Sequence, residues 1–124
     1  MRYVRIEHDG SGGSRSSDVD VPLTEQPFAE GVPPLLVSSA LSSGAIVFVE
    51  FPSDVRDTAP HPTPRRQLGV ILRGAVQTRT TDGEVRRLDA GAVVLLEDTE
   101  GAGHVTTVIE SPFQVMFVAL DSDS

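Results

Sequence analysis

The stretch His61-Pro-Thr-Pro-Arg-Arg-Gln67 lies near the middle of the chain, with Gly74 seven residues after it and Gly103-His104 much further on. Each proline fixes its own φ angle and biases the residue before it toward extended geometry, so His61 and Thr63 cannot lie on a helix. Side chains two residues apart on an extended segment point the same way. The stretch therefore predicts a strand-like segment that presents an imidazole and a hydroxyl group on one face.

Short β-rich segments, separated by Gly or Pro turn signals, occur on both sides of this stretch. We predict strands over residues 3–7, 19–22, 35–40, 45–51, 67–73, 75–81, 84–88, 92–96, 105–110 and 113–120. Asp82-Gly83 is a strong hairpin signal, whereas the composition of residues 9–17 predicts a flexible loop. Residues 23–29 are the one candidate helix, which prolines keep short. Strands at spacings of about ten residues are typical of an all-β sandwich or barrel.

The predicted strand over residues 67–73 is apolar on both faces. Leu68, Val70 and Leu72 share one face, and the other face, with Gly69 and Ile71, is nearly as apolar. A strand of this kind is covered on both sides. We therefore expect residues 1–41 to pack on the outside of the sheet or to exchange with a partner chain in a homodimer. Gly69 marks either the close approach of a neighbouring group or the relief of strand twist.

The composition limits the classes of function. With 124 residues the chain is sized for one domain, and a formal net charge of −8 argues against nucleic acid as a partner. All ten basic residues are arginine and cysteine is absent, which excludes lysine Schiff-base chemistry, disulfides and thiolate metal sites. No segment approaches the roughly 20 apolar residues of a membrane span, and the first residues lack the apolar block of a secretory signal. We therefore expect a cytoplasmic protein with no membrane partner.

Two sets of spacings resemble the motifs of the cupin superfamily. The first cupin motif is usually written G-x5-H-x-H-x3/4-E-x6-G, and this chain has His61-x-Thr63-x3-Gln67-x6-Gly74. Thr63 and Gln67 thus replace a histidine and a glutamate, and Val55 replaces the opening glycine. The spacing and the final glycine match.

The second cupin motif, G-x5-P-x-G-x2-H-x3-N, is matched less closely. Gly91 leads after five residues to Glu97-Asp98-Thr99, His104 arrives two residues late and Val108 replaces the asparagine. The span from His61 to Leu120 also resembles a subgroup of small single-domain bacterial and fungal cupins with His-Pro-x-Pro-Arg-Arg-Gln and Glu-Asp-Thr-x-Gly-x-Gly-His. The resemblance implies a single cupin domain over residues 1–124, with a double-stranded β-helix (jelly-roll) barrel over residues 45–120.

In a cupin-like barrel His61 and Thr63 face the interior, and His104 lies close enough for the two imidazoles to converge. Such a pocket holds two groups that titrate near neutrality, which suits proton transfer. We hypothesise a non-oxidative enzyme of specialised metabolism, an isomerase, a dehydrating lyase or a cyclase, with His61 and His104 as acid and base. The candidates for binding its small organic substrate are Thr63, Arg65, Gln67, Gly69 and Ile71. An inward-pointing Arg65 would hold a carboxylate or an enolate.

Two other functions remain open at this point. One is a metal-dependent oxygenase in which His61, Gln67 and His104 hold iron. Because the neutral Gln67 replaces a carboxylate, we expect any divalent metal (zinc, nickel or iron) to bind weakly. The other is a module that binds a small ligand without catalysis. Glu97 and Asp98 can each cap a turn or enter the pocket as a base, and Glu97 is our third catalytic candidate.

Overall fold

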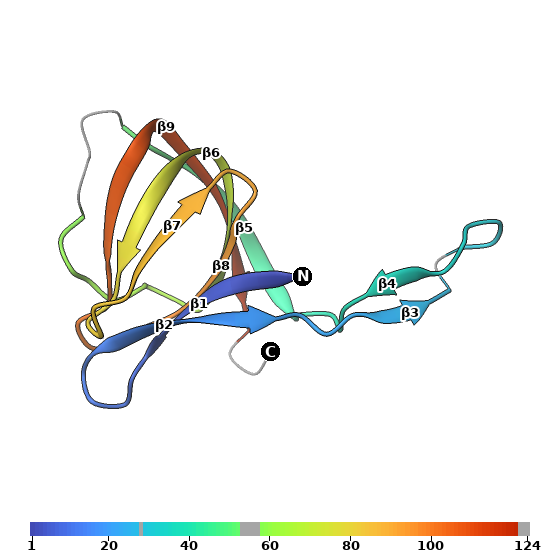
Figure 1. The fold of residues 1–124 in the computed structure, drawn as a ribbon, viewed down its shortest axis with the longest axis horizontal. Coiled ribbons are helices and arrows are strands. Elements are labelled where there is room, and N and C mark those ends of the chain that lie inside the picture. Colours follow the sequence, from blue (N-terminus) through green and yellow to red (C-terminus); the bar gives the residue numbers. More distant parts are fainter. Residues whose placement is uncertain (28, 53–57, 122–124) are drawn as a thin grey trace.

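The computed structural model describes residues 1–27, 29–52 and 58–121, and within these ranges the chain is all β (Figure 1). Its strands are β1 (Arg2–His8), β2 (Ser14–Asp20), β3 (Thr24–Gln26), β4 (Leu35–Val37), β5 (Ser43–Phe51), β6 (Gln67–Arg79), β7 (Val85–Asp89), β8 (Val93–Glu97) and β9 (Val105–Leu120). None of the described segments forms a helix of the length and apolarity that a membrane crossing takes.

Most of the described strands belong to one mixed sheet. The hydrogen-bonded order is β2-β1-β8-β6-β9-β5, and β7 pairs with β6. β1 runs parallel to β8, whereas the other neighbours in this sheet are antiparallel. β3 and β4 pair only with each other, in a separate two-stranded sheet. Figure 1 shows β6 and β9 bending strongly, so that the large sheet curls and has an inner and an outer face.

β6 and β9 are each one long strand where the sequence suggests two. β6 joins the predicted strands 67–73 and 75–81, and β9 joins 105–110 and 113–120. The register between them shifts around Gly74, whose φ of +77° is rarely adopted by residues with a side chain. A Cβ at Gly74 would overlap the backbone carbonyls of Glu110 and Pro112. The glycine therefore permits a bulge within a continuous strand rather than a turn between two strands.

Two predictions for the N-terminal part of the chain are wrong. β2 begins at Ser14, inside the segment that we predicted to be a flexible loop. Ser14 Oγ donates a hydrogen bond to the Gly103 carbonyl (2.5 Å), and Ser16 Oγ is bonded to Thr80 Oγ1 (2.9 Å). These long-range bonds outweigh the flexibility of a Gly/Ser-rich sequence. The helix expected over residues 23–29 is also replaced, since Thr24–Gln26 is strand β3.

The core is formed by inward-facing side chains of the large sheet. They are Ile6, Ile71, Val76, Leu88, Val94, Leu96, Val108, Phe113 and Val115. Gly69 lies near this core, and a Cβ there would lie 3.1 Å from Val94 Cγ1 and 3.2 Å from Phe117 Cε1. Close approach of neighbouring side chains therefore accounts for the glycine at this position in β6.

Candidate functional site

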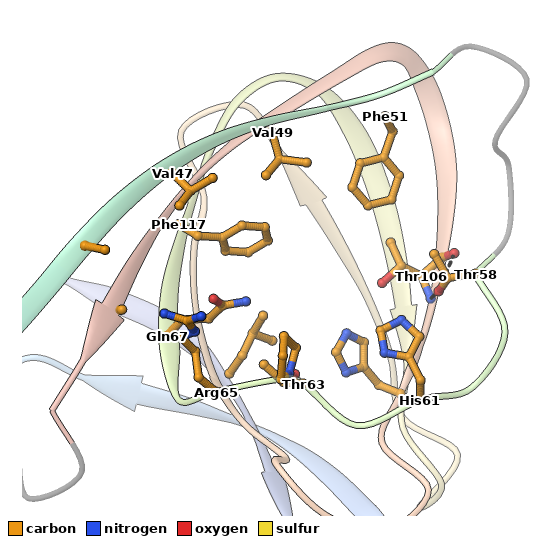
Figure 2. A pocket seen from close by; sticks show the side chains of 15 residues that line it. Val47, Val49, Phe51, Thr58, His61, Thr63, Arg65, Gln67, Thr106 and Phe117 are labelled. Atoms are coloured by element: carbon orange, nitrogen blue, oxygen red, sulfur yellow. Dashed lines mark hydrogen bonds between the residues drawn. The ribbon is translucent and has the colours of Figure 1, made fainter.

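A cavity of about 370 Å³ lies on the inner face of the large sheet (Figure 2). One wall is apolar and comes from β5 and β9, with Val47, Val49, Phe51 and Phe117. Polar side chains come from the chain around the starts of β6 and β9, namely Thr58, His61, Thr63, Arg65, Gln67, His104 and Thr106. Figure 2 shows the labelled polar side chains facing the apolar wall across the cavity. An apolar cavity with a few convergent polar groups is typical of a site for a small molecule.

Backbone contacts bring the two histidines of this cavity together. His61 and His104 form an isolated β-bridge, and the His104 backbone N–H donates to the His61 carbonyl at 3.4 Å. Gly103, with a φ of +69°, allows the chain to approach His61 this closely. The two imidazole rings have centroids 6.4 Å apart and planes at 41°. The two stretches that resemble cupin motifs therefore meet at one point of the site.

Asp98 is the buried partner of His104. Its side chain has no accessible surface, and its Oδ2 accepts a hydrogen bond from His104 Nδ1 at 2.6 Å. Thr63 supports the same carboxylate, because Thr63 Oγ1 donates to Asp98 Oδ1 (2.7 Å) and the Thr63 backbone N–H donates to the Asp98 carbonyl (2.9 Å). These contacts fix the orientation of the His104 ring, and in the neutral ring they favour the tautomer that has its proton on Nδ1 and the lone pair on Nε2.

His61 has a different environment from His104. It is exposed, and its Nδ1 lies 3.0 Å from the Pro62 carbonyl. A carbonyl oxygen only accepts, so in this contact Nδ1 is the donor and Nε2 is left for a ligand. The cavity thus holds one imidazole that is oriented by a buried carboxylate and one whose ring, among the described residues, is hydrogen-bonded to a neutral backbone carbonyl alone.

Glu97, our third catalytic candidate, is not among the described residues that line the cavity. Its two carboxylate oxygens accept hydrogen bonds from Arg5 Nε and Arg66 Nε, each at 2.5 Å. Burial raises the pKa of Glu97, but the hydrogen bonds from Arg66 and Arg5 outweigh this effect, and the net result is a pKa below the ordinary value. Glu97 therefore joins β1, β8 and the segment before β6, and the neighbouring Asp98 takes the inward position.

We expect Glu97→Gln to lower the free energy of unfolding by about 1–3 kcal/mol at about pH 7, because two charge-assisted hydrogen bonds lose their anionic acceptor. A depressed pKa in the folded state stabilises the fold above the ordinary glutamate pKa of about 4.3, and this stabilisation is lost as the pH falls through the folded-state value. Urea titrations should therefore show the gap between wild type and variant closing in acid. Glu84→Gln, whose Arg86 contact is 3.7 Å long and exposed, is the control. A gap that is the same at all pH values would contradict this role.

The remaining candidates divide between the cavity and its surroundings. Arg65 and Gln67 line the cavity, and in the part of the chain that the structure describes neither side chain has a hydrogen bond or an ion pair. Ile71 belongs to the core and borders a smaller void of about 60 Å³ beyond His104. Gly69 lies under Phe117, so it shapes the cavity only through that ring. The sequence leaves open whether Phe51 and Phe117 belong to the core or line a pocket, and the structure places both at the cavity. Val47 and Val49 of the same wall were not among the candidates, although the alternating pattern of β5 contains the signal.

Of the three candidate metal ligands, His61 and His104 meet at the β-bridge, and Gln67 lines the same cavity. Figure 2 shows Gln67 beside Arg65, with Thr63 between it and His61. Among residues 1–27, 29–52 and 58–121, no group of three or more His, Cys, Asp or Glu side chains is arranged to hold a metal ion. One nitrogen of His104 is also committed to Asp98.

Comparison with known proteins leaves the site to be interpreted on its own geometry. The sequence matches no protein-family model and no curated protein.

Proposed function

We propose that this protein is an enzyme that catalyses a non-oxidative proton transfer on a small organic substrate, as part of an isomerisation, a dehydration or a cyclisation. The observation that carries the proposal is the Asp98–His104 pair. A carboxylate without accessible surface is bonded to one nitrogen of an imidazole that lines the cavity. This arrangement orients a general base and stabilises the positive charge that the ring acquires on accepting a proton.

The proposed first step removes a proton from a carbon atom next to a carbonyl group. His104 Nε2 takes the proton, and the electron pair of the C–H bond moves to the carbonyl oxygen to give an enolate. His61, when protonated, donates a hydrogen bond or a proton from Nε2 to that oxygen. Where the enolate is conjugated with a C=C bond, return of the proton from His104 to the far carbon of that system completes an isomerisation. Where a hydroxyl group stands on the next carbon, the protonated His104 or His61 gives it a proton, and it leaves as water while the carbonyl re-forms and a C=C bond is made. In a cyclisation the enolate carbon attacks a second carbonyl carbon of the substrate, whose oxygen takes the electron pair and then the proton from His104.

The cavity favours an apolar substrate with one anionic group. Val47, Val49 and Phe117 provide the apolar surface. Arg65 provides the charge, since most of the described arginines are paired with carboxylates but Arg65 is not. In a chain with a net charge of −8, an unpaired guanidinium at a cavity suits a carboxylate or enolate brought by the ligand. Gln67, beside Arg65 in Figure 2, can donate to the same group.

We also propose the finer fold assignment, a cupin-type jelly-roll barrel. Two observations support it. The large sheet curls, as Figure 1 shows, and a cavity lies on its inner face. His61 and His104, which belong to the two cupin-like spacings, are paired and both line that cavity. The departure at Thr63 also has a role in the site, because the Thr63 hydroxyl donates a hydrogen bond to Asp98, the carboxylate that orients His104.

The test is solvent-deuterium incorporation, followed by NMR, into a panel of small oxo-acids that carry an apolar chain. We expect wild type to accelerate exchange at the carbon next to the carbonyl. His104→Ala should lose about 10²- to 10⁴-fold of that rate, as expected for a missing general base. His61→Ala should also be strongly impaired, and thermal melts should show both variants folded. His8→Ala is the control for activity, because His8 lies beside Glu100 outside the cavity.

The same experiment separates the proposal from a second candidate, a non-catalytic ligand-binding module. The predominantly apolar wall of β5 and β9 favours that candidate, since binding alone needs no general base. Panel members that raise the melting temperature of wild type but show no exchange would favour binding without catalysis. Full exchange in His104→Ala would remove the proposed base from the mechanism.

A further inference from the structure

A two-stranded extension, here called the arm and defined as residues 21–41, projects from the large sheet (Figure 1). Its root is held on both sides, because the Val21 backbone N–H donates to the Met1 carbonyl and the Asp121 N–H donates to the Ser42 carbonyl. Beyond the root, β3 and β4 pair only with each other, and every residue of both strands is exposed. An isolated two-stranded hairpin is marginally stable in water, so the arm needs a surface to pack on.

The arm is apolar where a free surface segment would be polar. Leu35, Leu36 and Val37 make up the whole of β4, and the side chain of Leu36 is 67% exposed. Val32 and Leu41 are also exposed. Exposed apolar residues that are scattered singly need no explanation, but a run of them on one projecting element indicates a contact surface.

The outer face of the large sheet is a second exposed apolar surface. Side chains of β5 alternate, so that Val47 and Val49 line the cavity while Ile46 and Phe48 point outward. Ile46 is 57% exposed and Phe48 is 71% exposed. Strand pairing extends each of these two residues into a row across the sheet. Ile46 lies beside Val118 and then Leu68, and Phe48 lies beside Met116 and then Val70.

This face extends to the root of the arm. A groove of about 380 Å³ there is lined by Tyr3, Leu41, Leu68 and Val93, among others. The groove and the two rows share Leu68, so the apolar surface runs from β5 to the place where the arm leaves the sheet. The arm of the same chain leaves this surface open, because it points away from the sheet (Figure 1).

We infer that two copies of this chain exchange arms, each arm packing on the outer face of the other copy, along the rows that contain Ile46 and Phe48. In a two-fold symmetric dimer each copy supplies one arm and one outer face, so the exposed apolar surfaces of both chains are covered. β1 and β2 already belong to the large sheet. We expected residues 1–41 to pack on the sheet or to exchange with a partner chain. Because β1 and β2 are strands of the sheet, the arm is the part of this segment that remains to be exchanged.

Charge favours the same partner. The only charged residues of the arm are Glu25 and Glu30. Arg73 of β6 lies opposite Gln114, next to the row of Phe48 and Met116, and it has no ion pair in the described parts of the chain. Glu50 shares the row of Arg73 and Gln114 and accepts a hydrogen bond from Gln114 Nε2, so that row carries one charge of each sign, and the acidic arm is complementary to its Arg73 end.

Sedimentation of the full-length chain tests the inference. We expect wild type to be dimeric at concentrations of about 50 µM, and Leu36→Glu and Phe48→Glu each to raise the dissociation constant by more than about 30-fold, because each buries a charge in the contact. Both residues are exposed within one chain, so neither change should unfold it. Val85→Glu, at an exposed apolar residue of β7 away from both surfaces, is the matched control and should remain dimeric. Arg73→Glu should weaken the dimer, and Glu25→Arg combined with it should restore part of the loss.

Cross-linking shows whether the arm itself is exchanged. The chain has no cysteine, so separately prepared L36C and F48C proteins can be mixed and oxidised without side reactions. We expect disulfide-linked dimers that contain one chain of each kind. A wild type that stays monomeric, or a dimer that survives both glutamate substitutions, would overturn the inference. A monomer that instead sediments with phosphatidylcholine vesicles would overturn it too and would assign the apolar surface to a lipid surface.

Discussion

Asp98→Asn is expected to reduce proton-transfer activity about 10³- to 10⁴-fold, with little change in KM. The amide has nearly the same shape as the carboxylate, but its NH2 group favours the His104 tautomer that is protonated on Nε2, and it lacks the charge that stabilises the imidazolium. Asp98 does not touch the substrate in this mechanism, so it is a positioning residue. The effect should therefore appear in kcat, whereas a residue that binds substrate would affect KM.

Glu97→Gln is the matched control for this experiment. It changes the neighbouring carboxylate in the same way, but that side chain is bonded to Arg5 and Arg66 instead of His104. We expect Glu97→Gln to lose stability and keep its catalytic rate. Asp98→Asn should keep its stability and lose catalytic rate. Deuterium exchange and urea unfolding on both proteins provide the comparison. Equal catalytic losses in the two variants would show that the Asp98–His104 hydrogen bond has no specific role.

Gly103→Ala is expected to lower the free energy of unfolding by about 3 kcal/mol or more, or to separate His61 from His104. Two costs add at this position. The backbone has a φ of +69°, which disfavours any side chain, and a Cβ would overlap the backbone carbonyl of His61. Because backbone fills the space, no rotamer change can relieve the contact. The His61 side of the bridge must move, and catalytic activity should fall together with stability.

Gly83→Ala is the control for the cost of the φ angle alone. Gly83 has a φ of +87° in the turn after β6, and a Cβ there would meet no atom within 4 Å. We expect a loss of about 1–2 kcal/mol from the left-handed backbone. Chemical denaturation of both variants isolates the steric contribution at Gly103. Equal losses would mean that the bridge between His61 and His104 relaxes without cost.

Local sequence signals predicted the parts of the site that depend on the direction of a strand. The prolines around His61 and Thr63 predicted an extended segment with both side chains on one face, and both residues line the cavity. The alternation of β8 could also have resolved the choice between the two acids, since Leu96 faces inward and Asp98 lies two residues further on. What Thr63 does could not be predicted in this way. Its hydroxyl group binds Asp98, which is 35 residues away in sequence.

The predictions that failed concern places where distant pairing overrides a local turn signal. Gly74 and Pro112 resemble breaks between strands, yet β6 and β9 each continue through them because the two strands pair along most of their length. Ser14 lies in a Gly/Ser-rich segment, but its buried hydrogen bond to Gly103 fixes it in a strand. In each case the deciding partner is far away in sequence, and composition carries no information about it.

The position of β9 has a consequence for how the protein is made. β9 lies between β6 and β5 in the sheet, although it follows both of them in sequence. While the chain leaves the ribosome, the β1–β2 and β6–β7 pairs can form locally, but β5 has no partner until β9 is synthesised. The apolar side chains of β5 therefore stay open to chaperones and to neighbouring nascent chains from the synthesis of β5 until that of β9. Folding of the large sheet, and with it the cavity, has to wait for the strand that arrives last.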